Sequence, residues 1–247
     1  MAQPLRGLLV NLVYPAIVAA LRGEIQPDTP SASGIAEAFA WKTHSYIVLS
    51  EELGSGINSG DYDEATQGRL FDVVAQNIRC VEGDVLEFGV ASGHSIRHLA
   101  KLFNDRKIYG FDSFQGIPEP WWTRPRGAFA VGCPPQVDAP NVELIEGLFS
   151  QTVPEFLTRW QGVAGLVHVD CDLYSSTLES LGAVLGRCQA GTVILFDEYY
   201  NYPDFAQHEW RAWRELRLCH GIVAPCIAYD GRRAAFQIRR PHGAPSA

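Results

Sequence analysis

The chain has 247 residues, 47% of them hydrophobic, which suits one large α/β domain with a sizeable core. Its formal net charge of −8 argues against nucleic acid as a partner, because phosphate backbones are bound by clusters of Lys and Arg. Six cysteines without a CxxC pair favour a reduced, cytoplasmic protein over a disulfide framework.

The apolar run LLVNLVYPAIVAAL, residues 8–21, raises the question of a membrane span. A helix of this length would reach about 21 Å against a hydrocarbon core of about 30 Å, and Pro15 interrupts it. We therefore expect no membrane span, and a helix that packs on the domain, on the partner in a homodimer or over the active site, with a membrane-associated helix as the alternative. Residues 24–63 are rich in Gly, Ser, Pro and Asp around a predicted helix over 35–48. Residues 1–63 are thus expected to form a helical cap, a lid or a dimerisation segment.

From residue 64 onward, apolar strands alternate with amphipathic helices. The pattern predicts helices over 65–80, 93–104, 152–160, 175–188 and 204–217, and strands over 83–90, 107–112, 141–147, 165–170, 191–197, 222–229 and 234–239. This alternation is typical of a doubly wound, mainly parallel seven-stranded α/β sheet. The Asp230-Gly231 turn predicts that the last two strands form an antiparallel hairpin. We expect this domain to occupy residues 64–240, with a flexible tail over 241–247.

Polar residues stand at the ends of five predicted strands, where ligands bind in sheets of this kind. They are Glu87 with Gly89, Asp112, Glu146 with Gly147, Asp170, and Asp197 with Glu198.

The segment EFGVASGHS predicts a cofactor-binding turn between a strand and a helix. Gly89 and Gly93 let the backbone approach a ligand, and the following helix offers free N–H donors. Asp112 ends the next strand, where a carboxylate can accept the hydroxyls of a ribose. A turn without a ligand is the alternative to this interpretation.

These features indicate an adenosine-bearing cofactor, and two of them favour S-adenosylmethionine over a dinucleotide. The turn is Gly-x-x-x-Gly, and Glu87 precedes it, where an acid would repel a diphosphate but tolerate the cationic methionyl end. A nicotinamide-dependent oxidoreductase and a non-catalytic cofactor-binding protein remain the alternative functions.

The segment HVDCDLYSST, residues 168–177, predicts the second half of the site. Asp170 and Asp197 lie one strand–helix–strand step apart and should stand side by side, with Glu198 adjacent. Converging carboxylates favour Mg²⁺, Mn²⁺ or Ca²⁺, which would lower the pKa of a bound hydroxyl. Asp170 is the first candidate for the base, with Asp172 and His168 behind it. The alternative is that Asp170 caps a helix and Glu198 faces solvent.

Four stretches, in this order, resemble the class I S-adenosylmethionine-dependent methyltransferases: EFGVASGHSIRHLA, GFDSFQGIPE, HVDCDLYSST and FDEYYNYPDF. They resemble in particular the macrocin O-methyltransferase group, which modifies sugar hydroxyls. The resemblance covers residues 64–240. It implies a magnesium-assisted O-methyltransferase acting on a small hydroxylated molecule, such as a glycoside or another secondary metabolite.

The resemblance also implies roles for individual residues. The metal ligands would be Asp170, Asp197 and Glu198, although the third position is usually Asp in that group. Related catechol-type enzymes use a lysine base after the first metal aspartate, whereas no lysine follows Lys107 here. The expected cofactor contacts are Glu87, Phe88, Gly89, Ala91, Ser92, Gly93, Ser95, Asp112, Ser113, Phe114, Gly147, Phe149 and Asp170.

Aromatic residues in two segments are the candidates for acceptor contact. The loop over 114–132 is long for a plain connection, and its Trp121 and Trp122 could stack on a sugar ring or form a surface flap. Tyr199 and Tyr200 follow the predicted metal ligands directly. The pair His208 and Glu209 is expected to be a solvated helix start.

Overall fold

The computed structural model describes residues 32–54, 56–62, 64–78 and 81–239. The apolar run over 8–21 and the tail over 241–247 lie outside the described residues. Within them, no helix combines the length and the hydropathy that crossing a membrane requires.

One mixed sheet carries the fold, with the strand order β1-β7-β8-β6-β5-β2-β3-β4. All seven predicted strands are present, and β1 is an additional strand of two residues. The final pair is antiparallel, which confirms the predicted hairpin, and the strands of the central run are parallel. The strands are β1 Ile57–Asn58, β2 Asp84–Phe88, β3 Ile108–Asp112, β4 Val142–Glu146, β5 Ala164–Val169, β6 Cys188–Phe196, β7 Cys226–Tyr229 and β8 Ala234–Gln237.

The helices follow the predicted alternation, with differences at their ends. A 3₁₀ turn, η3 Phe205–Gln207, replaces the start of the last predicted helix, and another, η2 Leu185–Arg187, replaces the end of the helix predicted over 175–188. The α-helices are α3 Ala32–Glu51, α4 Glu64–Ile78, α5 His94–Leu102, α6 Phe149–Arg159, α7 Tyr174–Val184 and α8 Glu209–His220.

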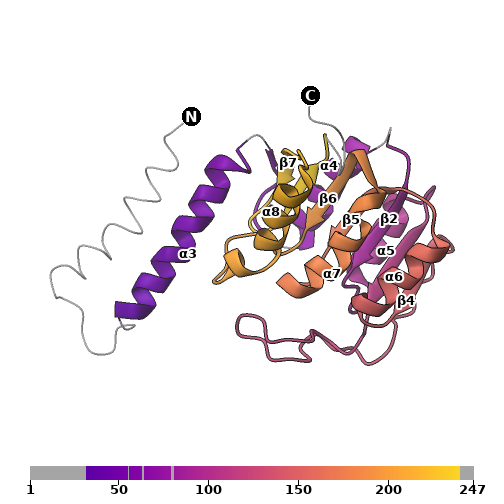
Figure 1. Cartoon of the computed structure of the whole chain (residues 1–247), viewed down its shortest axis with the longest axis horizontal. Helices are drawn as coiled ribbons and strands as arrows, with labels where there is room; N and C mark the ends of the chain where they lie inside the picture. Colours follow the sequence, from indigo (N-terminus) through magenta and orange to yellow (C-terminus); the bar gives the residue numbers. More distant parts are fainter. Residues whose placement is uncertain (1–31, 55, 63, 79–80, 240–247) are drawn as a thin grey trace.

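Both faces of the sheet are covered by helices, as a doubly wound fold requires (Figure 1). Alternate residues of β5 belong to two separate apolar clusters, because side chains alternate between faces along a strand. Leu166 packs with the residues of α4 and α5, whereas Val167 and Val169 pack with those of α6, α7 and α8. With both faces buried, the strand ends are where the sheet can present polar groups.

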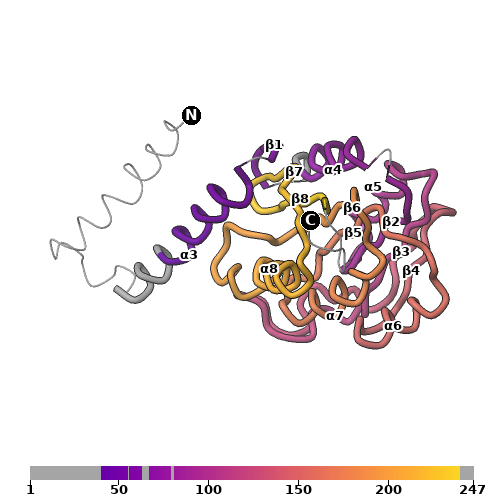
Figure 2. Tube along the Cα trace, turned by 45° about the horizontal axis from the view of Figure 1, so that its top comes forward, coloured from indigo at the N-terminus to yellow at the C-terminus, as the bar shows by residue number. Residues whose placement is uncertain are grey.

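The helix α3 extends away from the sheet, and its C-terminal end lies near β1 and β7 (Figure 2). The hydroxyl of Tyr199 donates to Glu52 at 2.6 Å, and the N–H of Asn201 donates to the Ser45 hydroxyl at 3.2 Å. These contacts tie α3 to the edge of the sheet that carries the predicted acidic residues.

Candidate active site

A cavity of about 270 Å³ opens at the ends of β2, β3, β5 and β6. The structure brings residues of both predicted halves to this one cavity. From the predicted cofactor half come Gly89, Ala91, Asp112, Ser113, Gly147 and Phe149, and from the acidic half come Asp170, Asp172, Asp197 and Glu198.

The turn after β2 brings the ends of β2 and β5 very close together. Gly89 has φ +97°, and a Cβ atom at this position would lie 1.7 Å from the carbonyl oxygen of Asp170. Only glycine permits this approach, which sets the cofactor turn directly beside the first predicted metal ligand. Gly93 caps α5 with φ +80° and no side-chain cap, so the first N–H groups of this helix have no side chain from the cap to bind them.

Asp112 has a structural role beyond the predicted ribose contact. Its Oδ2 accepts the N–H groups of Val90 and Ala91, each at 2.8 Å, and its Oδ1 accepts that of Phe114 at 2.7 Å. The carboxylate therefore anchors the glycine-rich turn while it also lines the cavity.

Several predicted cofactor contacts do not line the cavity. Phe88 points into the core and stacks on Phe111 at a centroid distance of 4.9 Å. Glu87, the residue before Phe88, points to the opposite face of the sheet. Its carboxylate is fully buried there and lies 2.9 Å from His168 Nδ1. The predicted residues that lie outside the cavity lining are Glu87, Phe88, Ser92, Gly93, Ser95 and Phe114.

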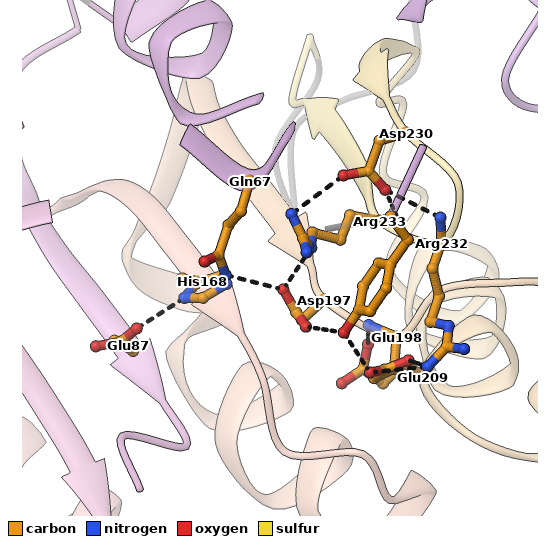
Figure 3. Close-up of polar contacts among 10 residues, drawn as sticks. Gln67, Glu87, His168, Asp197, Glu198, Glu209, Asp230, Arg232 and Arg233 are labelled. Atoms are coloured by element: carbon orange, nitrogen blue, oxygen red, sulfur yellow. Dashed lines mark hydrogen bonds and ion pairs between the residues drawn. The ribbon is translucent and has the colours of Figure 1, made fainter. Parts of the chain in front are cut away.

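The acidic half contains two arginines that the sequence interpretation missed (Figure 3). Arg233 Nε lies 2.9 Å from Asp197 Oδ1, and Arg232 Nη1 lies 3.1 Å from Glu198 Oε2. The Tyr62 hydroxyl lies between the two carboxylates, at 3.0 Å from Asp197 Oδ2 and 2.9 Å from Glu198 Oε1. Protein groups thus supply part of the positive charge that had been assigned to a metal ion alone.

Neither alternative for the acidic residues agrees with the structure. The N-cap of α7 is Leu173, with no side-chain cap bond, so Asp170 does not cap this helix. The Glu198 side chain is buried instead of facing solvent. Both side chains instead line the cavity.

The prediction of a solvated start for α8 was wrong for Glu209, whose side chain is fully buried. Its carboxylate accepts the N–H groups of Asp172 at 3.2 Å and of Glu198 at 3.1 Å. Glu209 thus joins the segments that follow β5 and β6. Asp172 adopts φ +63°, a strained conformation for a residue with a side chain.

The acidic half holds several carboxyl groups whose pKa values are raised. Burial, and then the charge of Asp197, raise the pKa of Asp170 well above its ordinary value. The same two causes raise the pKa of Asp172 to about 7 and the pKa of Glu198 to about 8. Unfavourable negative charge of this kind would be relieved by a bound cation.

A divalent cation fits one part of this cluster. Ligating atoms of His168, Asp170 and Asp197 all lie within 4.8 Å of one another. Glu198 does not belong to this group, and its two oxygens contact Tyr62 and Arg232. Two of the three predicted metal ligands are therefore brought together with His168, and the third, Glu198, is not part of this group.

The structure does not bring the predicted acceptor-contacting aromatics to the cavity. Trp121, Tyr199 and Tyr200 are buried in the core, and the Tyr200 hydroxyl donates to the carbonyl oxygen of Asp230. Trp122 is exposed but does not line the cavity. From the same long loop, the residues that line it are Gly116, Ile117, Pro118 and Phe129.

Some of the site residues that the sequence interpretation missed could have been predicted from the sequence, and others could not. Arg232 and Arg233 directly follow the predicted Asp230-Gly231 turn, so their place at one end of the hairpin was readable. Tyr62 and Gln67, which also contacts Asp197, precede the regular part of the domain. No pattern in the sequence points from them to the acidic cluster.

Comparisons with known proteins agree with this architecture. A family model described as a methyltransferase domain matches residues 86–199. The chain is 28% identical over 177 residues to the 8-demethyl-8-(2,3-dimethoxy-alpha-L-rhamnosyl)-tetracenomycin-C 4'-O-methyltransferase of Streptomyces olivaceus. That match covers 61% of this chain and 64% of the relative, so the chain aligns with less than two thirds of that protein.

Two solved structures show the same fold. The calicheamicin methyltransferase CalS11 is 22% identical, with 85% of this chain and 94% of that chain covered and a TM-score of 0.59. The O-methyltransferase NovP is 19% identical, with 83% and 100% covered and a TM-score of 0.56. The strand order, the methyltransferase-domain match and these structural likenesses together establish that the chain has the class I methyltransferase fold.

Proposed function

We propose that this protein transfers a methyl group from S-adenosylmethionine to a hydroxyl of a glycoside or a related secondary metabolite. The observation that carries the proposal is that one cavity is lined both by the glycine-rich turn with Asp112 and by the carboxylates of Asp170 and Asp172. A methyl donor bound on the turn would face an acceptor hydroxyl held at those carboxylates. The relative from Streptomyces olivaceus, named for O-methylation of a rhamnosyl group, supports a sugar as the acceptor.

The cofactor half would bind S-adenosylmethionine through backbone and side-chain groups. The backbone at Gly89 and Ala91, which line the cavity, suits its methionyl end, and Asp112 suits the ribose hydroxyls. Gly147 and Phe149 line the cavity beside Asp112, at the end of β4, where they would flank the adenine.

The transfer is a displacement in which a C–O bond forms as the C–S bond of the sulfonium breaks. S-adenosylhomocysteine leaves as a neutral thioether, and the hydroxyl proton goes to a carboxylate. Positioning of the two reactants accounts for much of the rate in such a reaction. Asp172 suits the proton-accepting role, because its carboxylate lines the cavity and no hydrogen bond to it is found within the described residues.

Asp170 and Asp197 would hold a divalent cation beside the acceptor. Such an ion, when bound, stabilises the developing alkoxide as a Lewis acid. Asp170 would then serve as a ligand more than as the base. Arg233 would balance the remaining charge of Asp197 through the ion pair at 2.9 Å.

The proposal is tested with purified protein, S-adenosylmethionine and a set of rhamnosides, with S-adenosylhomocysteine as the measured product. We expect calorimetric binding of S-adenosylmethionine and none of NADH, and turnover that is lost with EDTA and restored by a divalent ion. Asp170→Asn should abolish turnover while the cofactor Kd changes by less than about threefold. Binding of NADH instead of S-adenosylmethionine would support the oxidoreductase alternative, and cofactor binding without any transfer would support a non-catalytic protein.

A further inference from the structure

The imidazole of His168 is fully buried in the centre of the sheet. Its Nδ1 lies 2.9 Å from Glu87 Oε1, and its ring forms a T-shaped contact with Phe71 at a centroid distance of 5.3 Å. With Nδ1–H directed at Glu87, a neutral imidazole carries its lone pair on Nε2. Nε2 is buried and has no hydrogen-bonding partner among the described residues. A buried polar atom without a partner requires an explanation.

The free edge of this imidazole faces the acidic cluster. β5 lies between β2 and β6, so a ring that binds Glu87 of β2 on one side presents its other side toward the end of β6. Figure 3 shows His168 between Glu87 and Asp197 in this way. Ligating atoms of His168, Asp170 and Asp197 lie within 4.8 Å of one another, close enough to share one ion.

Both carboxylate oxygens of Glu198 already have protein partners. Its Oε1 lies 2.9 Å from the Tyr62 hydroxyl and its Oε2 lies 3.1 Å from Arg232, whose guanidinium stacks over the Tyr62 ring at 4.5 Å. Asp197 also has protein partners, namely Arg233 and the Gln67 amide at Oδ1 and the Tyr62 hydroxyl at Oδ2. Each carboxylate oxygen carries two lone pairs, so Asp197 can keep its ion pair and still bind an ion.

We propose that His168 Nε2, Asp170 and Asp197 are the protein ligands of the cation, and that Glu87 orients the imidazole. This inference rests on the proposed function, and it replaces Glu198 by His168 as the third ligand. A histidine that donates its other ring N–H to a carboxylate is the usual arrangement at metal sites. One nitrogen and two oxygen donors favour a transition ion such as Mn²⁺ over Mg²⁺, which prefers oxygen ligands.

The test measures metal binding directly, with the full chain stripped of metal by a chelator. Mn²⁺ is titrated while the signal of free Mn²⁺ is followed by electron paramagnetic resonance, and pulsed measurements detect coupling to a ¹⁴N ligand. We expect one bound Mn²⁺ with nitrogen coupling, and weaker binding of Mg²⁺ by at least about tenfold. Bound Mn²⁺ without nitrogen coupling would overturn the ligand assignment, and this measurement needs no variant.

Variants then separate the two possible third ligands. His168→Gln should weaken Mn²⁺ binding by about 10–100-fold and remove the nitrogen coupling, and Glu87→Gln should weaken binding by about tenfold. Glu198→Gln should leave the affinity within about threefold. The matched control is His98→Gln, because His98 also contacts the Phe71 ring but lies outside the acidic group. Loss of binding in Glu198→Gln, or retention in His168→Gln, would refute the inference.

Methyl transfer is scored separately, so that the two proposals can fail independently. Nitrogen-coupled Mn²⁺ without any transfer would leave the metal site standing and reject the proposed activity. Transfer without detectable Mn²⁺ binding would reject the metal site and leave the activity standing.

Discussion

Glu209 provides the sharpest test of how the acidic half of the cavity is held in place. Its carboxylate accepts the N–H groups of Asp172 and Glu198, which belong to segments that follow two different strands. Glu209→Ala leaves both N–H groups without this acceptor in a buried environment. We therefore expect the substitution to destabilise the fold and to loosen both segments.

The size of the effect follows from these two bonds. Each unsatisfied buried N–H costs about 1–3 kcal/mol, so the loss would be about 2–6 kcal/mol for the pair. The substitution also removes a buried carboxylate whose pKa is raised by burial and by the charge of Asp172, and this relief offsets part of the loss. We expect a net decrease in the free energy of unfolding of about 3 kcal/mol, and about 1 kcal/mol for Glu209→Gln, which keeps one acceptor oxygen.

Urea denaturation at neutral pH measures this difference. With a slope of about 3 kcal/mol per molar, the midpoint of Glu209→Ala should fall by about 1 M. Glu215→Ala is the matched control on the same helix, because its exposed carboxylate pairs with Arg211 at the surface, where such pairs contribute less than about 1 kcal/mol. A midpoint for Glu209→Ala that equals that of the control would refute this account of Glu209.

Two further predictions concern the ligands. Asp112→Ala should raise the calorimetric Kd for S-adenosylhomocysteine more than about tenfold, which corresponds to about 1.4 kcal/mol, because Asp112 anchors the turn and lines the cavity. An unchanged Kd would mean that the ribose is held elsewhere. A neutral rhamnoside should have a kcat/KM at least about tenfold above that of rhamnose linked to a nucleoside diphosphate, because the described lining residues include no cationic side chain that would pair with a diphosphate. Equal kcat/KM values for the two substrates would contradict this reasoning. Among the described residues that line the cavity there is no Lys, Arg or His, and the acids are Asp112, Asp170, Asp172, Glu179, Asp197 and Glu198.

The sequence alone was sufficient for the order of strands and helices and for the ends at which the polar residues stand. Strands and helices are set by short-range periodicity, which is visible in a single chain. Adjacent parallel strands bring their ends to one edge, so Asp170 and Asp197 could be placed side by side from their spacing. The glycine-rich turn and Asp112 were found for the same reason, and both line the cavity.

Only the tertiary structure decided which groups surround those carboxylates. Tyr62 reaches Asp197 across 135 positions of the chain, and Arg232 reaches Glu198 across 34. Such contacts depend on how the terminal hairpin and the segment before α4 pack on the sheet, which no local pattern encodes. The burial of Glu209 and the lone pair of His168 are likewise consequences of packing, because the same residues at a helix start or in a strand are compatible with many environments.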